Sequence, residues 1–277
     1  MPPAYRLLWI GDSHATLEFQ LAAEETAGII PMRQIPDIAA ASRLPAADEN
    51  SLPPTIICLA EPRPGLIGFA DVLALSRRWP LAQIISISSC LADGCRRSGP
   101  ALPGVTCVAW HDFPARLQCW LVELAAGRPG SLGLPATARR DERWQHPARA
   151  AAVAGVRWRP QVTVAGDSAA TAEAAADLVR VAGGEVIHQA TGRPPIADES
   201  ACIVWDRGDR IDGDLGWLEL LAGQRPGRLI VLLCSFPRGD AVAAARAAGA
   251  TAVLGRPADR EALTGILLRA RIALSAV

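Results

Sequence analysis

The same short motif occurs twice in the chain. Residues 7–18 read LLWIGDSHATLE, and residues 162–173 read VTVAGDSAATAE. Each copy is an apolar run followed by Gly-Asp-Ser and then by apolar residues at helical spacing, so each predicts a strand, a turn and a helix. Such a repeat indicates two similar halves, and 277 residues are long enough for two domains of ordinary size.

Short apolar runs alternate with helical patterns in both halves. The predicted strands are 5–10, 28–35, 55–60, 82–88 and 104–110 in the first half, and 161–165, 185–189, 201–205, 228–235 and 251–255 in the second. The predicted helices lie near 13–26, 65–78, 89–97, 113–126, 168–182, 215–223, 240–249 and 259–274, whereas the Ala/Pro-rich segment 36–54 shows no clear helix. Continuous apolar strands between helices imply parallel sheets covered on both faces. We therefore expect an α/β protein with two doubly wound (βα)5 domains.

The segment between the halves, residues 127–159, is rich in Arg, Pro and Gly and holds seven arginines. Its composition is typical of a solvated linker. The alternative is a basic docking segment, in which the arginines together with Trp144 and Trp158 stack on a partner or on nucleic acid. The expected division is a first domain at 1–126, this linker, and a second domain at 160–277.

The composition excludes several functions. The 28 basic residues equal the 28 acidic ones, which does not suggest a nucleic-acid binder. All the basic residues are arginines, so no lysine can form a Schiff base or bind phosphate in a nucleotide loop. The seven cysteines form no C-x-x-C pair, and most lie within apolar runs, which indicates buried reduced thiols of a cytosolic protein. No signal peptide or bilayer-length apolar run is evident. We expect a cytoplasmic protein without membrane contact.

The second half resembles a response-regulator receiver domain over its whole length. Its most similar stretch is AARAAGATAVLGRP, residues 244–257. Gly166-Asp167 falls on the acidic pair of such domains, and Asp206 on the phosphoacceptor at the end of the third strand. The other matched positions are Cys234 or the adjacent Ser235 at the hydroxyl position, and Arg256-Pro257 at the Lys-Pro position.

The resemblance implies the strand order 2-1-3-4-5 and a site at the carboxyl ends of the strands. Mg²⁺ requires several oxygen ligands, and here the acids are reduced to Asp167 and Asp206, a weak pair of candidate metal ligands. Arg256 keeps the positive charge of the usual lysine but not its compact geometry. We therefore expect no bound cofactor.

The first half departs further from the receiver pattern. Asp12 is again a single acid, Ala60 or Glu61 lies at the phosphoacceptor position, and Trp110-His111 replaces Lys-Pro. Because both copies lack matching chemistry, the leading hypothesis is a pair of degenerate receiver-like domains. Such a chain would be a non-enzymatic regulatory or scaffolding protein of a signalling pathway that binds a partner protein. Self-association through the helix at 113–126, which carries Trp120, is a further expectation.

Alternative interpretations remain open. The first is a working response regulator phosphorylated on Asp206, with a histidine kinase as partner. The second is a GDSL-type esterase with Ser13 or Ser168 as nucleophile, although no histidine follows an aspartate at the required C-terminal spacing. A weaker resemblance, to cobalamin-binding domains, makes His14 a metal ligand. Finally, Asp12 and Asp167 fit simple N-caps of the helices that follow them.

The domain division predicts where a protease cuts the folded chain. Trypsin at low concentration should cleave first at the arginines within 127–159, because linkers with few contacts are the preferred sites of nicking. The two fragments, identified by mass spectrometry, should then persist. Early cleavage within 200–255, with the linker intact, would contradict the division.

Overall fold

The computed structural model describes residues 5–44, 52–63, 65–92, 102–127, 132, 159–209 and 211–274. By its contacts the chain divides into two compact units, Met1–Pro114 with Leu132–Thr137 and Ala115–Ser131 with Ala138–Val277. The predicted linker at 127–159 lies almost wholly outside the described residues. The division at 126 and 160 therefore stays a prediction.

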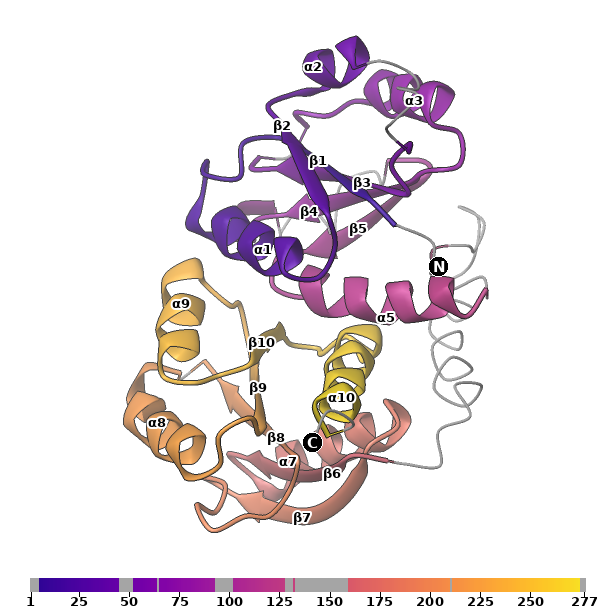
Figure 1. Cartoon of the computed structure of the whole chain (residues 1–277). Helices are drawn as coiled ribbons and strands as arrows, with labels where there is room; N and C mark the ends of the chain where they lie inside the picture. The colour runs from indigo at the N-terminus through magenta and orange to yellow at the C-terminus, as the bar shows by residue number, and fades with distance from the viewer. Residues whose placement is uncertain are drawn as a thin grey trace. The chain divides into compact units, whose positions relative to one another are not determined.

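The first unit contains a parallel five-stranded sheet of order β2-β1-β3-β4-β5 (Figure 1). Its strands are β1 (Leu7–Ile10), β2 (Met32–Ile35), β3 (Ile56–Glu61), β4 (Gln83–Ser88) and β5 (Val105–Ala109). The helices between them are α1 (Leu17–Ala27), α2 (Ile38–Arg43), α3 (Phe69–Arg78) and the 3-10 turn η1 (Cys90–Ala92), and α5 (Phe113–Ala125) follows β5.

Two details differ from the sequence prediction for this unit. The segment 36–54 does contain a short helix, α2, because the side chain of Asp37 caps it by accepting a hydrogen bond from the Ala40 N–H at 2.6 Å. The helix predicted near 89–97 begins as the 3-10 turn η1, and residues 93–97 lie outside the described ranges.

The sheet of the second unit has the order β10-β9-β8-β6-β7. Its strands are β6 (Gln161–Gly166), β7 (Glu185–Thr191), β8 (Cys202–Gly208), β9 (Leu229–Cys234) and β10 (Ala252–Gly255), all parallel. Its helices are α7 (Ala169–Val181), η3 (Asp212–Asp214), α8 (Leu215–Gln224), α9 (Gly239–Ala247) and α10 (Arg260–Leu274). Read from the other edge, this is again 2-1-3-4-5, so the predicted fold class is confirmed for both sheets.

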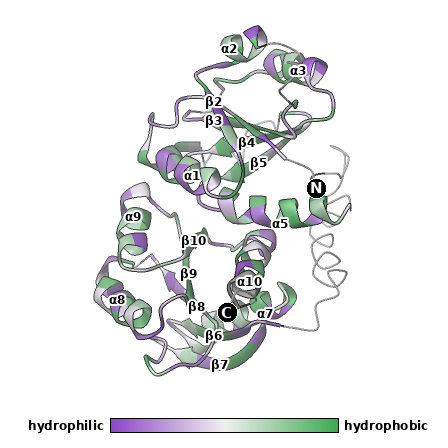
Figure 2. Ribbon diagram, in the orientation of Figure 1, coloured by the Kyte–Doolittle hydropathy of each residue, from purple (hydrophilic) through white to green (hydrophobic). Residues whose placement is uncertain are grey.

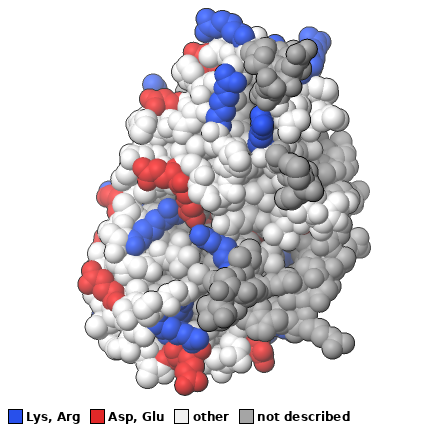
Figure 3. Space-filling model, viewed as in Figure 1, with Lys and Arg blue, Asp and Glu red and all other residues white. Residues whose placement is uncertain are grey.

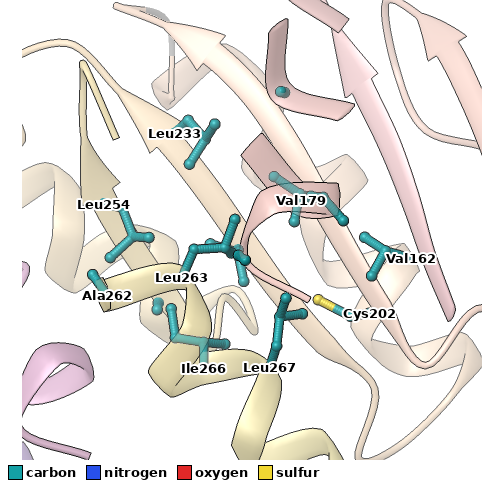
Figure 4. Close-up of a cluster of buried hydrophobic side chains, with 14 of the residues drawn as sticks. Val162, Val179, Cys202, Leu233, Leu254, Ala262, Leu263, Ile266 and Leu267 are labelled. Atoms are coloured by element: carbon teal, nitrogen blue, oxygen red, sulfur yellow. The ribbon is translucent and has the colours of Figure 1, made fainter. Parts of the chain in front are cut away.

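Apolar side chains from the strands and the covering helices form the cores. Figure 2 shows hydrophobic residues along the strands of both sheets. In the second unit α7 and α10 close one face of the sheet, and Figure 4 shows Leu263, Ile266 and Leu267 of α10 among residues of α7, β6 and β9. No helix in the described ranges has the length and apolar character needed to cross a bilayer.

Helix α5 follows β5 in the chain, but from Ala115 on it is counted with the second unit, where it packs against α10. Arg116 of α5 pairs with Glu261 at 2.5 Å and lies 3.6 Å from Asp259. Gly265 of α10 allows this close approach, since a Cβ there would lie 3.0 Å from the carbonyl carbon of Ala115.

This contact predicts a steric penalty at Gly265. Gly265→Ala should lower the free energy of unfolding by about 1–3 kcal/mol, because the new methyl group meets backbone atoms that cannot move independently. Gly223→Ala is the matched control, since its Cβ meets nothing within 4 Å and alanine is the better helix former. Urea denaturation checks both variants, and equal stability of the two would contradict the close α5–α10 packing.

Candidate functional site

The carboxyl ends of the second sheet bring the predicted site residues to one edge. Strand register places Gly166 of β6 beside Asp206 of β8, and Gly208 beside Cys234 of β9. The backbone N–H of Arg256, just after β10, donates to the Cys234 carbonyl at 3.0 Å. Parallel strands expose their carboxyl ends together, so this grouping follows from the strand order.

Asp206 is the most buried acid of this edge, with 6% of its surface exposed. Its Oδ1 accepts a hydrogen bond from the Gly208 N–H at 3.1 Å and lies 3.4 Å from Nη1 of Arg256. Burial raises the pKa of Asp206 above its ordinary value of 3.8, and the hydrogen bond from Gly208 and the charge of Arg256 offset only part of this rise. The carboxylate at the phosphoacceptor position thus already has a cationic neighbour.

Arg207 is a site residue that the sequence interpretation missed. Its Nη1 lies 2.5 Å from Oδ1 of Asp167, and its Nη2 pairs with Asp214 at the start of α8. Its guanidinium also stacks over the ring of Trp205, 5.0 Å from the centroid. The single remaining acid of the expected acidic pair is therefore held by an arginine.

The network continues beyond Asp214. Arg193 donates to Asp214 through Nε at 2.7 Å and lies over the ring of Trp217 at 5.2 Å. The ring nitrogen of Trp217 donates to the Pro194 carbonyl at 3.1 Å. Acids and arginines thus alternate along this edge, which keeps each buried charge beside an opposite one.

Close packing around Gly166 leaves no room for an acidic side chain at this position. A Cβ at this position would lie 2.6 Å from the backbone nitrogen of Ala172 and 2.7 Å from the hydroxyl oxygen of Thr171. Helix α7 therefore approaches the end of β6 too closely for any side chain there. The second acid of a receiver site does not fit this backbone.

The hydroxyl position is occupied by a buried thiol followed by a serine. Burial, and next the charge of Asp209, raise the pKa of Cys234 to about 11, so its thiol is protonated at neutral pH and is a weak nucleophile. Ser235 donates its backbone N–H to the Gly208 carbonyl at 2.8 Å. Both residues line an open pocket of about 360 Å³, whose other lining residues are Asp209, Ile211, Asp212, Phe236, Arg238, Asp240 and Ala241.

Pro257 completes the set of predicted positions. It follows Arg256 through a cis peptide bond, directly after β10. Arg256 is more exposed than Arg207, with 36% of its side chain accessible against 11%.

In the first unit the corresponding residues make local contacts. Asp12 accepts a hydrogen bond from the backbone of His14 at 2.8 Å, and Glu61 accepts one from the backbone of Leu66 at 3.1 Å. His111 is buried, and its Nδ1 lies 2.9 Å from Oδ1 of the adjacent Asp112. These contacts hold the segments around Asp12, Glu61 and His111 in place.

The N-cap hypothesis for Asp12 and Asp167 is wrong. Thr16 caps α1 by accepting from the Phe19 N–H, and Ser168 caps α7 by accepting from the Thr171 N–H, both at 3.2 Å. The turn after each strand is longer than expected, so the cap falls one or more residues beyond the acid.

The serines of the esterase alternative have structural partners. Ser168 is the N-cap of α7, and the buried hydroxyl of Ser13 donates to the side-chain oxygen of Gln34 at 3.1 Å. Within the residues that the structure describes, no group of three or more His, Cys, Asp and Glu side chains is placed to hold a metal ion. Asp167 and Asp206, the predicted ligands, do not fit Mg²⁺ here because each faces a guanidinium.

Comparison with known proteins yields no family. No family model matches the chain, and no curated protein matches it. Several solved structures are similar, and the two described next are so at low identity. A pilus assembly-related protein from Burkholderia pseudomallei is 22% identical, with 42% of this chain and 94% of that chain covered and a TM-score of 0.38. The C-terminus of RcsC from E. coli, containing a linker region and a phosphoreceiver domain, is 13% identical, with 99% and 96% covered and a TM-score of 0.36. The fold assignment rests on the strand order of the two sheets.

The raised pKa of Asp206 predicts a pH-dependent stability difference. In the folded state the pKa lies above the unfolded value, so the ionised carboxylate lowers stability at pH values above the folded pKa, and the penalty disappears below about pH 4. Asp206→Asn should therefore be more stable than the wild type at pH 7, by about 1.4 kcal/mol for each unit of pKa elevation. The difference should shrink as the pH falls.

Urea denaturation at several pH values measures this difference. Asp177→Asn, on the exposed side of α7, gives the background effect of removing a surface carboxylate. An Asp206→Asn variant that is less stable than the wild type at pH 7, with the loss vanishing in acid, would mean that the ion pair with Arg256 outweighs burial.

Proposed function

We propose that the chain is a non-enzymatic regulatory or scaffolding protein of a cytoplasmic signalling pathway, built from two degenerate receiver-like domains that bind a partner protein. One observation carries the proposal: the two acids that a receiver site would use for its metal and phosphoryl group, Asp167 and Asp206, are each paired with an arginine.

The chemistry of phosphoryl transfer gives this observation its weight. Transfer to a carboxylate requires a divalent cation that neutralises oxygens of the moving phosphoryl group. Here Arg207 competes with a cation for Asp167, and Gly166 cannot be replaced by a second acid without a clash. Because arginines already neutralise Asp167 and Asp206, the site favours this fixed arrangement over phosphorylation of Asp206.

A receiver-like domain that is not phosphorylated can still bind a partner protein, and we assign this function to both domains. A histidine kinase or another signalling protein is the class of partner that the resemblance suggests, and self-association is an additional option. Nucleic acid is disfavoured, because acidic and basic residues are equal in number and are interspersed on the face shown in Figure 3.

The proposal predicts that the protein resists chemical phosphorylation. Incubation with acetyl phosphate and millimolar Mg²⁺ should give no phosphate adduct in intact-protein mass spectrometry, because the cation that the transfer needs is excluded. A working receiver domain, treated in parallel, is the positive control.

The Asp206→Asn variant identifies the acceptor if an adduct does form. A single adduct that is present in the wild type and absent from this variant would overturn the degenerate-receiver proposal. It would establish the alternative, a response regulator phosphorylated on Asp206.

A further inference from the structure

Three carboxylates from separate segments gather around Arg207. Asp167 follows β6, Asp206 lies in β8, and Asp214 immediately precedes α8. Arg207 pairs directly with Asp167 and Asp214, and its charge also lowers the pKa of Asp206. Asp214 is not among the receiver positions, so this grouping differs from the site that the sequence suggested.

Two of these carboxylates, Asp167 and Asp206, are close enough to repel each other. The charge of Asp167 raises the pKa of Asp206, and a Cβ at Gly208 would lie 3.9 Å from Oδ2 of Asp167 and 3.3 Å from Nη1 of Arg256. Carboxylates that approach in this way are stabilised either by a metal ion or by a guanidinium. In this chain the guanidinium is supplied by the residue next to Asp206.

Arg207 is held more firmly than Arg256. Its side chain is 11% exposed and is contacted by two carboxylates and by the ring of Trp205. Arg256 is 36% exposed and approaches Asp206 only to 3.4 Å. A partly exposed pair at that distance contributes little, whereas a buried shared guanidinium is costly to remove.

We propose that Arg207 is the resident cation of this edge: its guanidinium pairs with both Asp167 and Asp214 and so keeps divalent metal ions from binding these carboxylates. Arg207, rather than Arg256, is then the residue that excludes divalent cations. This inference rests on the proposed function and identifies how the site of the second unit is kept inactive.

Mn²⁺ binding to the full chain tests the proposal, with free Mn²⁺ measured by electron paramagnetic resonance. Arg207→Met should bind one Mn²⁺ at least about tenfold more tightly than the wild type, because the competing positive charge is gone. Arg207→Lys keeps the charge and should stay close to the wild type. Arg256→Met is the matched control and should raise the affinity less than Arg207→Met does, because the pair of Arg256 with Asp206 is longer and more exposed.

A second substitution shows whether the new binding uses the proposed carboxylates. Adding Asp214→Asn to Arg207→Met should reverse the gain, which a general loosening of the fold would not do. If Arg207→Met does not fold, Arg207→Gln replaces it, since its amide can still donate to Asp214. Stabilisation of this variant by Mn²⁺ in thermal denaturation is then the readout.

The outcomes separate the inference from the proposed function. No gain in Arg207→Met or Arg207→Gln, or an equal gain in Arg256→Met, overturns the role of Arg207 but leaves a wild type that resists acetyl phosphate consistent with a degenerate receiver. A phosphate adduct on the wild type overturns the proposed function, whatever the Mn²⁺ affinities of the variants.

Discussion

The guanidinium of Arg207, which pairs with both Asp167 and Asp214, offsets the negative charge that the fold gathers at one edge of the second sheet. A parallel sheet directs the carboxyl ends of its strands to one edge, so acids at the ends of β6 and β8 come together there. Burial raises the pKa of Asp206, which is the sign of an environment that disfavours uncompensated negative charge. Arg207 and Arg256 supply the compensating positive charge from within the chain, so the acids of this edge need no bound cation to balance them.

Close backbone packing reinforces this arrangement. Helix α7 starts so near the end of β6 that Gly166 cannot be replaced by a residue with a side chain. The position of the helix therefore explains why the second acid is absent. Gly208 has a positive φ of 53°, where a side chain would be strained and would crowd Arg256. Placing a second acid at Gly166 would therefore require a change to the backbone as well.

The resemblance to receiver domains implied the strand order, and the apolar runs indicated which residues end strands. Together they were sufficient to predict the grouping of Asp167, Asp206, Cys234 and Arg256 at one edge of the sheet. It did not reveal the partners of these residues. Arg207 lies beside Asp206 in the chain, but its pairing with Asp167 and Asp214 depends on how the segment after β8 folds back. The prediction that Asp12 and Asp167 cap their helices was wrong for a similar reason. The Gly-Asp-Ser motif does not determine the length of the turn that follows it.

The packing of helix α5 could not be predicted from the sequence either. The sequence predicted this helix and its Trp120, but its packing on α10 depends on Gly265 and on the pairing of Arg116 with Glu261, which no pattern within α5 predicts. Side-chain chemistry and local periodicity therefore identify elements and candidate residues, while their pairing follows from tertiary structure.

A crystal structure of the wild-type protein grown in the presence of Mn²⁺ tests the central claim most directly, because anomalous scattering locates the metal. The account predicts that the guanidinium of Arg207 lies between Asp167 and Asp214, with no anomalous peak at the carboxyl edge of the second sheet. An anomalous peak bound by Asp167 and Asp206, with Arg207 displaced, would contradict it.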